Sequence, residues 1–278
     1  MIECPTVVKS EIRTHYDLAT PFYWLLWGPH IHHGLWHGNE SPAVAQHQLI
    51  EAMIARAALK PGERVVDVGC GMGGSTVEMA RHGCDVTGVT LSGVQRLWAT
   101  CRAKMCGAGE RTRFIRADAE KLELPAQSVD VVWSIECTEH LFDKGAFFRK
   151  AATWLRPGGR FAICAWLAGE EPLSAELRKQ VFDVCEGFLC PSLATSSDYL
   201  GWFADAGLED LEFVDWTAQV DRTWEICRQR VQRFGLPTLV GPINRNMRLF
   251  LDRFDAILTA YRSGAMRYGC LTGRLSAS

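Results

Sequence analysis

A glycine loop between a run of valines and a helical segment constrains this chain more than any other feature. The stretch "VVDVGCGMGG" (65–74) places Gly69, Gly71 and Gly74 in a G-x-G-x-x-G pattern. Glycine is needed where a tight turn lets the backbone approach a ligand beneath the N-terminus of a helix. The pattern predicts a strand, a ligand-binding turn and a helix in succession. Its structural alternative is a turn that only packs the helix on the strand.

Short apolar runs alternate with helical stretches on both sides of this loop. Helices are expected from Pro42 to just before Pro61 and over 76–81, 92–106 and 142–155. The apolar runs are "RVVDV", "DVTGV", "RFIRA", "VDVVWSI" and "RFAICAWL". Valine and isoleucine runs bounded by glycine and separated by helices predict a parallel sheet that is buried on both faces. Right-handed crossovers make such a sheet doubly wound.

The pattern changes after about residue 170. Amphipathic stretches over 173–188, 196–206 and 222–234 surround one strand in "LEFVDW". A longer helix is expected from Asn244 to Arg262, and it leads into a final strand in "AMRYGCLTG". These two strands bring the expected total to a mostly parallel, seven-stranded sheet of the α/β class.

The later segments are too small to form an independent second domain, so we expect one domain over residues 1–278. Within it, we expect residues 1–40 to form an N-terminal lid and 41–168 to form the ligand-binding core. Residues 169–278 would supply the remaining lid segments, which contact the second reactant, and the last strands.

Composition limits the partners of this chain. The 30 Lys and Arg residues nearly balance the 32 Asp and Glu residues, so the positive field that nucleic acid or anionic lipid requires is not expected. No apolar run approaches the length of about 20 residues that spans a membrane, and "MIECPTVVKSEIR" lacks a signal-peptide core. Eleven cysteines without a C-x-x-C pair indicate a reducing compartment. We expect a cytoplasmic protein that binds small molecules; the sequence does not indicate its oligomeric state.

Two residues near the glycine loop separate its possible ligands. A nicotinamide site normally presents an acidic residue about 20 positions later to hold the ribose, whereas "VTGVTLS" offers Thr90. Asp67, two residues before Gly69, matches the D-x-G-x-G loop of S-adenosylmethionine enzymes. The sequence therefore predicts S-adenosyl-L-methionine as the cofactor.

The chain resembles class I S-adenosylmethionine-dependent methyltransferases over nearly its whole length. More narrowly, it is similar to the tocopherol and sterol methyltransferases, the methyltransferases of antibiotic pathways and the cyclopropane fatty acid synthases. The matching stretches are "HYDLATPFY" (15–23), "WGPHIHHGLW" (27–36), "VVDVGCGMGGS" (65–75), "GVTLSGVQ" (88–95), "ADAEKLELP" (117–125), "VWSIECTEHLFDK" (132–144), "LRPGGRF" (155–161) and "GAMRYG" (264–269).

This resemblance implies a Rossmann-like cofactor site and a set of residues around it. The cofactor-binding residues implied are Ile31, His32, Asp67, Gly69, Gly71, Thr90, Leu91, Gln95, Asp118, Ala119 and Glu136. Gly69 and Gly71 would contact the methionine moiety, and Thr90 and Gln95 the ribose. Structural alternatives stay open: Thr90 could end a strand, Asp118 could cap a turn, and Glu136 could be a loop acid.

The stretch "WGPHIHHGLWH" (27–37) holds four histidines, which raises the question of a metal site. No carboxylate or cysteine accompanies them at ligand spacing, so we expect no metal. The resemblance instead implies that this segment folds over the cofactor and lines the acceptor pocket, where aromatic rings enclose a sulfonium ion and an apolar acceptor. The implied acceptor residues are Tyr16, Tyr23, His33, Trp36, Trp166 and Tyr268; the alternative is that the aromatic residues are ordinary core residues.

Glu139 and His140 follow the fourth strand in "SIECTEHL", at the edge where open α/β folds keep their chemistry. An imidazole can remove the acceptor's proton, and the resemblance to antibiotic-pathway enzymes implies that His140 is the general base. In cyclopropane synthases the residue matching Glu139 helps to hold bicarbonate, whereas His33 and Cys164 replace two other residues of that site. Which of Glu139 and His140 is the base stays open, as does a helix-capping role for His140.

Ten tryptophans favour an apolar acceptor, because a charged one would need several buried polar partners. We expect a methyltransferase of secondary metabolism that acts on carbon, nitrogen or oxygen of a small, ring-bearing or prenyl-like metabolite. Two alternatives stay open: a cyclopropane-synthase-like lipid enzyme, and a cofactor-binding protein without transferase activity.

Overall fold

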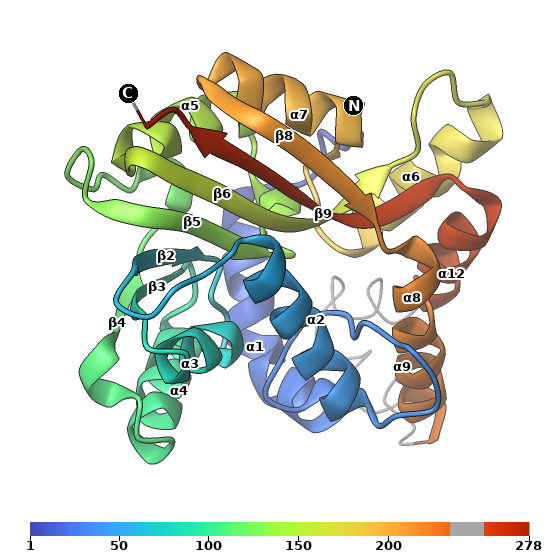
Figure 1. The fold of residues 1–278 in the computed structure, drawn as a ribbon. Coiled ribbons are helices and arrows are strands. Elements are labelled where there is room, and N and C mark those ends of the chain that lie inside the picture. The colour runs from blue at the N-terminus through green and yellow to red at the C-terminus, as the bar shows by residue number, and fades with distance from the viewer. Residues whose placement is uncertain (234–252, 278) are drawn as a thin grey trace.

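The centre of the molecule is a seven-stranded sheet in the order β4-β3-β2-β5-β6-β9-β8 (Figure 1). We describe residues 1–233 and 253–277 of a computed structural model. The strands are β4 (Thr112–Arg116), β3 (Asp85–Thr90), β2 (Arg64–Val68), β5 (Val129–Ile135), β6 (Leu155–Ala168), β9 (Met266–Leu275) and β8 (Leu208–Asp215). Only β9 runs against its neighbours in this sheet. The predicted mostly parallel, doubly wound sheet is confirmed.

The valine-rich strands bury both faces because successive side chains point to opposite sides. Val65 and Val131 pack into one apolar cluster, whereas Val66 and Val132 pack into the other. The first cluster includes side chains of α2 (Pro42–Arg56), α3 (Gly74–Arg81) and α4 (Gly93–Met105). The second includes side chains of α5 (Lys144–Trp154) and α7 (Ser196–Asp205), which cover the other face in Figure 1.

Side-chain caps fix where several of these helices begin. Ser41 accepts a hydrogen bond from the Val44 amide, and Pro42 occupies the first helical position, as the sequence predicted. Ser92 caps α4 in the same way by accepting from the Gln95 amide. Because α4 begins directly after β3, this cap also sets the direction in which the chain leaves the carboxyl end of the sheet.

Helices outside the sheet layers gather over one end of it. They are α1 (Lys9–Trp27), α6 (Ala175–Gly187), α8 (Thr217–Val220), α9 (Arg222–Arg233) and α12 (Phe254–Ser263), and their apolar faces share one buried cluster (Figure 1). A short pair that the sequence did not predict, β1 (Ile2–Glu3) with β7 (Ser192–Leu193), joins the N-terminus to this region. The expected helix from Asn244 is described only as α12; residues 244–252 lie outside the described residues.

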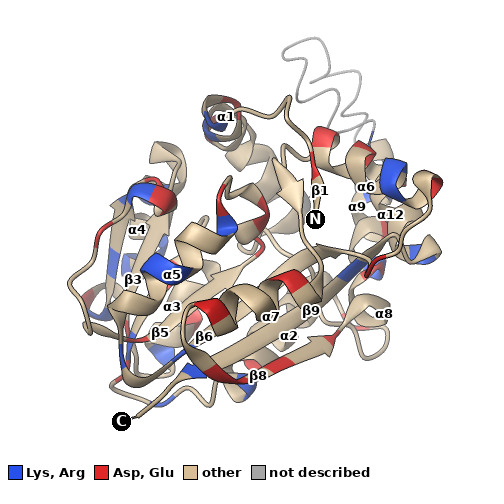
Figure 2. Cartoon of the chain, turned by 90° about the horizontal axis from the view of Figure 1, so that it is seen from above, with Lys and Arg blue, Asp and Glu red and all other residues tan. Residues whose placement is uncertain are grey.

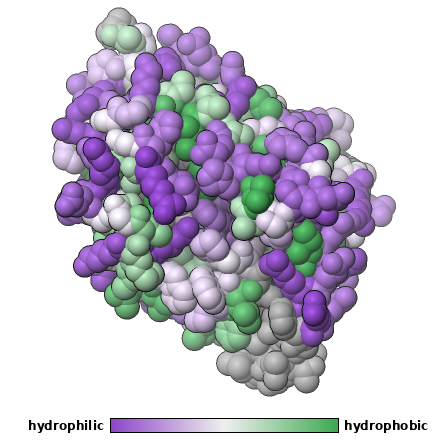
Figure 3. All heavy atoms as spheres, turned by 60° about the horizontal axis from the view of Figure 1, so that its bottom comes forward, coloured by the Kyte–Doolittle hydropathy of each residue, from purple (hydrophilic) through white to green (hydrophobic). Residues whose placement is uncertain are grey.

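The surface mixes charges of both signs (Figure 2). Strand β8 forms one edge of the seven-stranded sheet, and acidic residues lie along it: Glu209, Asp210 and Glu212. Charged side chains on an edge strand oppose pairing with another sheet. On the face shown in Figure 3, apolar residues are interspersed with polar ones. Among the described helices, none is long and apolar enough to cross a membrane.

We predict that Phe148→Ala lowers the free energy of unfolding by about 3–5 kcal/mol, because it leaves a cavity in a fully buried cluster. Phe148 is 0% exposed and packs edge-on against Phe203 and Tyr199. Urea denaturation followed by circular dichroism measures the change. Leu97→Ala is the control, since Leu97 is 62% exposed and its loss should change stability by less than about 0.5 kcal/mol.

Candidate active site

Two neighbouring cavities open at the carboxyl end of the central strands. The first has a volume of about 770 Å³ and lies beside the glycine loop and the ends of β3 and β5. The second, of about 510 Å³, lies between α1, β6 and α9. Tyr16, Ile31, Glu136 and His140 line both cavities. A ligand in the first cavity and a ligand in the second would therefore meet at these four residues.

The glycine loop forms one wall of the first cavity, which we call the cofactor cavity. Gly69 and Gly71 have φ angles of +79° and +52°, a left-handed region that glycine enters without steric cost. A Cβ on Gly69 would stand 2.2 Å from the Cβ of Cys137, so the strand end admits only glycine there. A Cβ on Gly71 would have only the Gly69 carbonyl oxygen, at 4.0 Å, within reach, so a larger side chain would extend into the cavity.

Asp67 supports this loop from behind. Its carboxylate accepts hydrogen bonds from Ser75 Oγ at 2.9 Å and Thr76 Oγ1 at 2.6 Å, in the first turn of α3. Burial raises the pKa of Asp67 to about 6, although these two hydrogen bonds act in the opposite direction. Asp67 lines neither cavity. The structure therefore places it behind the loop, where its hydrogen bonds to the first turn of α3 orient the loop.

The far end of the cofactor cavity is polar. Thr90 Oγ1 donates to Gln95 Oε1 at 2.8 Å, and both residues line the wall together with Leu91. Asp118 and Ala119 line the next stretch. The Asp118 carboxylate accepts from the Glu120 amide at 3.0 Å, so Asp118 both caps a turn and faces the cavity.

Helix α1 closes the cofactor cavity from outside. At its start, Lys9 Nζ donates to Asp118 Oδ2 at 2.9 Å and also bonds Glu120. Further along the same helix, Asp17 accepts a hydrogen bond from the hydroxyl of Ser92, the residue that caps α4, at 2.5 Å. These contacts attach the lid helix directly to the loops that follow β3 and β4. One wall of the cavity therefore comes from a segment that is far from those loops in the sequence.

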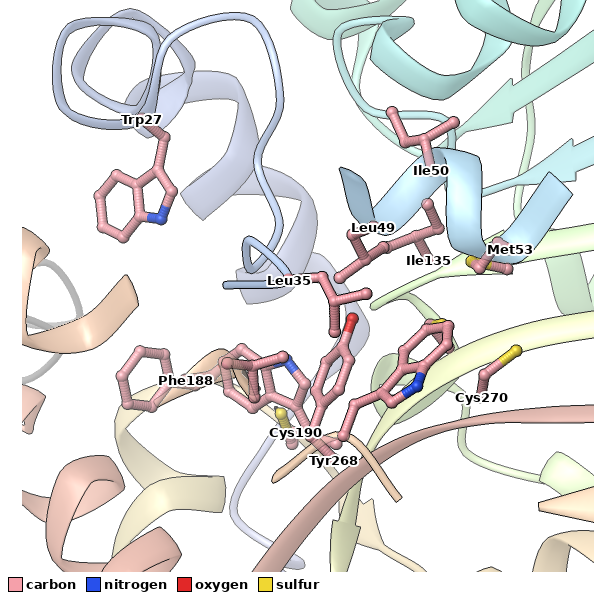
Figure 4. Close-up of a cluster of buried hydrophobic side chains, with 14 of the residues drawn as sticks. Trp27, Leu35, Leu49, Ile50, Met53, Ile135, Phe188, Cys190, Tyr268 and Cys270 are labelled. Atoms are coloured by element: carbon pink, nitrogen blue, oxygen red, sulfur yellow. Dashed lines mark hydrogen bonds between the residues drawn. The ribbon is translucent and has the colours of Figure 1, made fainter. Parts of the chain in front are cut away.

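The second cavity, which we call the acceptor cavity, has aromatic walls. Its aromatic residues are Tyr16, Tyr23, Trp27, His32, His33, His140, Trp166, Phe188 and Trp224. In Figure 4, Trp27 projects from α1 toward the side of the core cluster that holds Phe188, Cys190 and Tyr268. His32, which the resemblance implied as a cofactor contact, lines this acceptor cavity rather than the cofactor cavity.

Two residues that the resemblance implied as acceptor contacts lie outside this cavity. Trp36 is buried against the start of α9, where its Nε1 donates to Thr223 Oγ1 at 3.0 Å and the Arg222 guanidinium lies over its ring. The chain turns away after Leu35, whose amide bonds the Ala45 carbonyl, and this carries Trp36 out of reach. Tyr268 lines neither cavity, but its hydroxyl donates to Glu136 Oε1 at 2.8 Å.

Glu136 is the polar centre of the wall between the cavities. Its Oε1 accepts from the His33 amide and the Tyr268 hydroxyl, both at 2.8 Å. Its Oε2 accepts from Trp166 Nε1 at 2.8 Å and lies 3.0 Å from His33 Nδ1. Burial alone would raise the pKa of Glu136, but the electrostatic interaction and the hydrogen bonds with His33 lower it below its ordinary value. Glu136 is therefore an ionised carboxylate in an otherwise apolar region.

His140 lies on the short helical turn Thr138–His140, which follows β5. Its Nδ1 lies 3.0 Å from the Leu189 carbonyl oxygen, which can only accept, so Nδ1 carries the proton. Its Nε2 lies 2.8 Å from the Tyr16 hydroxyl and presents a lone pair to it. Burial lowers the pKa of His140 to about 4, so the ring is neutral at physiological pH. This geometry suits a proton acceptor.

Glu139, on the same turn, has the opposite protonation state to Glu136. Its Oε1 accepts from the Trp166 amide, and its Oε2 has no hydrogen-bond partner within the described part of the chain. Burial raises the pKa of Glu139 to about 8. At neutral pH the side chain therefore carries its proton, and it lines the acceptor cavity.

The four histidines of residues 27–37 point in different directions. His33 bonds Glu136 through Nδ1 and accepts from Trp224 Nε1 at 2.6 Å, whereas His32 Nδ1 bonds the His33 carbonyl. His30 packs against Gly74, and His37 is exposed. Over residues 1–233 and 253–277, no group of three or more His, Cys, Asp or Glu side chains is placed to hold a metal ion.

Several site residues had no signal in the sequence. Phe188, Cys190 and Trp224 line the acceptor cavity from segments after residue 170, and their spacing fits ordinary amphipathic helices. Lys144 is buried beneath the Glu139–His140 turn and donates to the Leu141 carbonyl at 2.8 Å and to Ser192 Oγ at 2.7 Å. A lysine in the first turn of a helix is normally predicted to be exposed, so the burial of Lys144 is seen only in the folded structure.

The sheet order, the glycine loop and the two adjoining cavities agree with the S-adenosylmethionine-dependent methyltransferase that the resemblance implied. The mycolic acid cyclopropane synthetase family model matches residues 5–233. The chain belongs to this family, and its cofactor is S-adenosyl-L-methionine.

Relatives and solved structures extend this likeness. The chain is 32% identical to the 27-O-demethylrifamycin SV methyltransferase of Amycolatopsis mediterranei (strain S699), over 89% of this chain and 91% of that one. It is 28% identical to the chloroplastic tocopherol O-methyltransferase of Arabidopsis thaliana, over 95% and 82% of the two chains. The fold matches the crystal structure of the [4+2]-cyclase SpnF with a TM-score of 0.86 and 22% identity over 100% of both chains.

We predict that Gly71→Val abolishes the rise in melting temperature that S-adenosylmethionine causes, because the new side chain would enter the cofactor cavity. Differential scanning fluorimetry with and without the cofactor measures the shift. Gly62→Val is the matched control: Gly62 also has a positive φ, +86°, but lies in a turn before β2, away from the cavity. A normal shift in Gly71→Val would contradict the assignment of the loop.

Proposed function

We propose that this enzyme methylates a hydroxyl oxygen of a small, largely apolar, ring-bearing or prenyl-like metabolite. The observation that carries the proposal is the Tyr16–His140 pair in the wall shared by the two cavities. A neutral imidazole with its lone pair turned toward a hydroxyl can remove one proton, which an acceptor alcohol or phenol must lose. The tocopherol relative is named as an O-methyltransferase and the rifamycin relative as a 27-O-demethylrifamycin SV methyltransferase, and both names support the same interpretation.

The residues of the cofactor cavity fit S-adenosylmethionine. When bound, the cofactor supplies a methyl group on a positively charged sulfur. We propose that Gly69 and Gly71 hold the methionine moiety through the backbone and that Thr90 and Gln95 hold the ribose. Asp118 would accept a hydrogen bond from the adenine amine at the end closed by Lys9.

The acceptor cavity suits an apolar ring. Its aromatic walls remove water from the reactants, and an acceptor between them gains contact with Trp27, Trp166 and Trp224. The ionised group in the wall, Glu136, already receives hydrogen bonds from His33, Trp166 and Tyr268. A highly charged acceptor would thus lose its water without gaining a charged group that is free to pair with it, so we expect sugars, amino acids and phosphorylated metabolites to be poor acceptors.

Tyr16 connects the acceptor to the base. Burial raises the pKa of the Tyr16 hydroxyl well above its ordinary value, so the hydroxyl keeps its proton and donates it to His140 Nε2. An acceptor oxygen next to Tyr16 can pass its proton to the tyrosine oxygen as the tyrosine proton moves to His140. The Leu189 carbonyl accepts from Nδ1 and holds the ring in the required tautomer throughout.

A deuterium-labelled methyl donor separates this reaction from its alternatives. The protein is incubated with the labelled cofactor and a panel of alkylated phenols, indoles, terpene alcohols, unsaturated lipids and polar metabolites at equal concentration, and the products are analysed by mass spectrometry. A methyl product keeps all three deuterium atoms, whereas a cyclopropane keeps two. Label on oxygen of an apolar acceptor supports the proposal; label on a lipid ring or a preference for charged acceptors overturns it. Cofactor binding without any turnover would favour the alternative of a cofactor-binding protein without transferase activity.

We also propose a cytoplasmic enzyme of secondary metabolism that works without nucleic acid. All eleven cysteines have free thiols, which supports a reducing compartment. We further propose that residues 1–40 and 169–278 act as the lid of a single domain whose core is 41–168, since α1, α9 and the segment directly after α6 supply outer walls of the cavities.

His140→Ala should lower kcat by roughly 100-fold or more, because it removes the base, while the affinity for cofactor stays nearly unchanged. Tyr16→Phe should cause a loss in the same direction, because it interrupts the path to His140. The double variant should lose no more than about what His140→Ala loses alone, since the two groups act in series. Steady-state kinetics and calorimetric titration of the cofactor provide the measurements. A fall in cofactor affinity with kcat preserved would show that His140 is structural.

We expect protonation of the base to lower kcat/KM near pH 4 and not near the ordinary histidine value of about 6.5. The base must be neutral, and the folded-state pKa of His140 is lowered to about 4 by burial, so protonation occurs only there. Burial also lowers the pKa of His15 to about 4, and His15→Gln is therefore the control. A decline centred near pH 6.5, or one that disappears in His15→Gln, would contradict the role of His140.

A further inference from the structure

We propose that Glu139, in its acid form, donates a hydrogen bond from Oε2 to a second oxygen of the acceptor, and so selects acceptors with two oxygen atoms. The inference rests on the proposed function, because it assumes that the reactive hydroxyl faces Tyr16 and His140. Glu139 and His140 are consecutive residues of one short turn, and both line the acceptor cavity. The acceptor chemistry implied is a ring or prenyl alcohol with a nearby carbonyl, ether or hydroxyl oxygen.

A residue that lines the acceptor cavity and has a polar atom without a partner is the first observation behind this proposal. Glu139 is 2% exposed, and its Oε2 has no partner among the described residues. A buried polar atom without a partner costs about 1–3 kcal/mol, so folded proteins retain few of them unless a ligand completes the bond. Glu139 lines the acceptor cavity, so an acceptor is in a position to supply that partner.

The contrast between the two carboxyl groups is the second observation. Glu136 receives hydrogen bonds from His33, Trp166 and Tyr268, which is the environment of a carboxylate. Among the described residues, Glu139 receives one from another residue, donated by the Trp166 amide to Oε1. Two neighbouring carboxyl groups in an apolar region ionise separately, and the one with more donors ionises first. The proton therefore stays on Glu139, where Oε2 is the oxygen free to donate it.

The surroundings of Glu139 agree with this state. Burial is the largest influence and raises its pKa, and the negative charge of Glu136 adds to the increase. The Trp166 amide, the backbone amide of Glu139 itself and Lys144 oppose it. Lys144 is itself buried, and burial lowers its pKa. Five other titratable groups interact electrostatically with Glu139. Burial raises the pKa of each, so all five are neutral near physiological pH: Tyr16, Cys137, Cys190, Tyr199 and Tyr261. His140, next in the chain, is neutral as well.

The donor role limits what the second oxygen can be. A carbonyl or ether oxygen offers only lone pairs and accepts directly from Glu139, and a hydroxyl can do the same. A methylene at that place would leave Oε2 without a partner in the complex. An enzyme site that is built to hydrogen-bond a polar atom discriminates strongly against analogues that lack it, because the buried group is then left unpaired.

Matched acceptors test the proposal. The probes are the three ring isomers of an alkylated methoxyphenol and the corresponding alkylated ethylphenols, in which a methylene replaces the ether oxygen at nearly equal size. We expect the wild-type enzyme to prefer the methoxyphenol over its ethyl analogue by about 10-fold in kcat/KM for at least one isomer. Glu139→Gln keeps a donor at the same place and should keep the preference. Glu139→Leu should reduce the preference to about onefold.

The pH dependence of the preference provides a second readout that a merely structural role would not move. The wild-type preference should fall above pH 8, where Glu139 loses its proton, and should persist to pH 9 in Glu139→Gln. A preference that survives in Glu139→Leu, or one that is absent for every isomer in the wild type, would overturn the proposal.

Binding without turnover separates this proposal from the proposed function. Tryptophan fluorescence of the wild type and both variants, saturated with S-adenosylhomocysteine, gives the affinity for each probe even if no methyl is transferred. A preference for methoxyphenol that depends on Glu139 but occurs without methylation would overturn the O-methylation proposal and support the role of Glu139. Methylation of both probes with equal affinities would overturn the role of Glu139 alone. If Glu139→Leu does not fold, the test is the preference for methoxyphenol at pH 7 and pH 9, compared between the wild type and Glu139→Gln.

Discussion

The buried carboxylate of Glu136 is the interaction on which the site depends. It ends β5 in a left-handed conformation, with φ +52°, and joins three segments that are far apart in the chain: the N-terminal segment through His33, β6 through Trp166 and β9 through Tyr268. A charge can be buried only where donors replace its water, so the folded chain must hold these segments together around it. The same contacts form the wall that the two cavities share.

Burial controls the chemistry of the neighbouring groups as well. The aromatic residues that exclude water from the acceptor cavity also penalise charge, which keeps His140 neutral as a base and Glu139 protonated as a donor. The two residues are adjacent, yet their pKa values move in opposite directions because the charged form is the cation in one and the anion in the other. One physical cause thus prepares both a proton acceptor and a proton donor beside the place where the reactants meet.

Much of the cofactor cavity could be predicted from the sequence, because short-range patterns determine it. Gly69, Gly71, Thr90, Gln95 and Asp118 belong to loops that directly follow strands, and all of them line that cavity. The walls from the lid were harder to predict. Trp36 belongs to the stretch "WGPHIHHGLW" that carried the resemblance and Trp224 to no such stretch, yet only Trp224 of the two lines the acceptor cavity. Asp67, which carried the prediction of the cofactor, lies behind the loop on Ser75 and Thr76.

The sequence by itself determined the class of fold and the cofactor, since alternating valine and isoleucine runs, helix caps and a glycine loop act over a few residues each. Only the tertiary structure decided the states of the two glutamates. Glu136 and Glu139 follow the same strand three positions apart, but Glu136 meets His33 and Tyr268, whereas Glu139 lines the acceptor cavity and has one oxygen without a partner among the described residues. Hydrogen-bond partners and desolvation set the proton on each, and both come from segments more than a hundred residues away or from the packing around them.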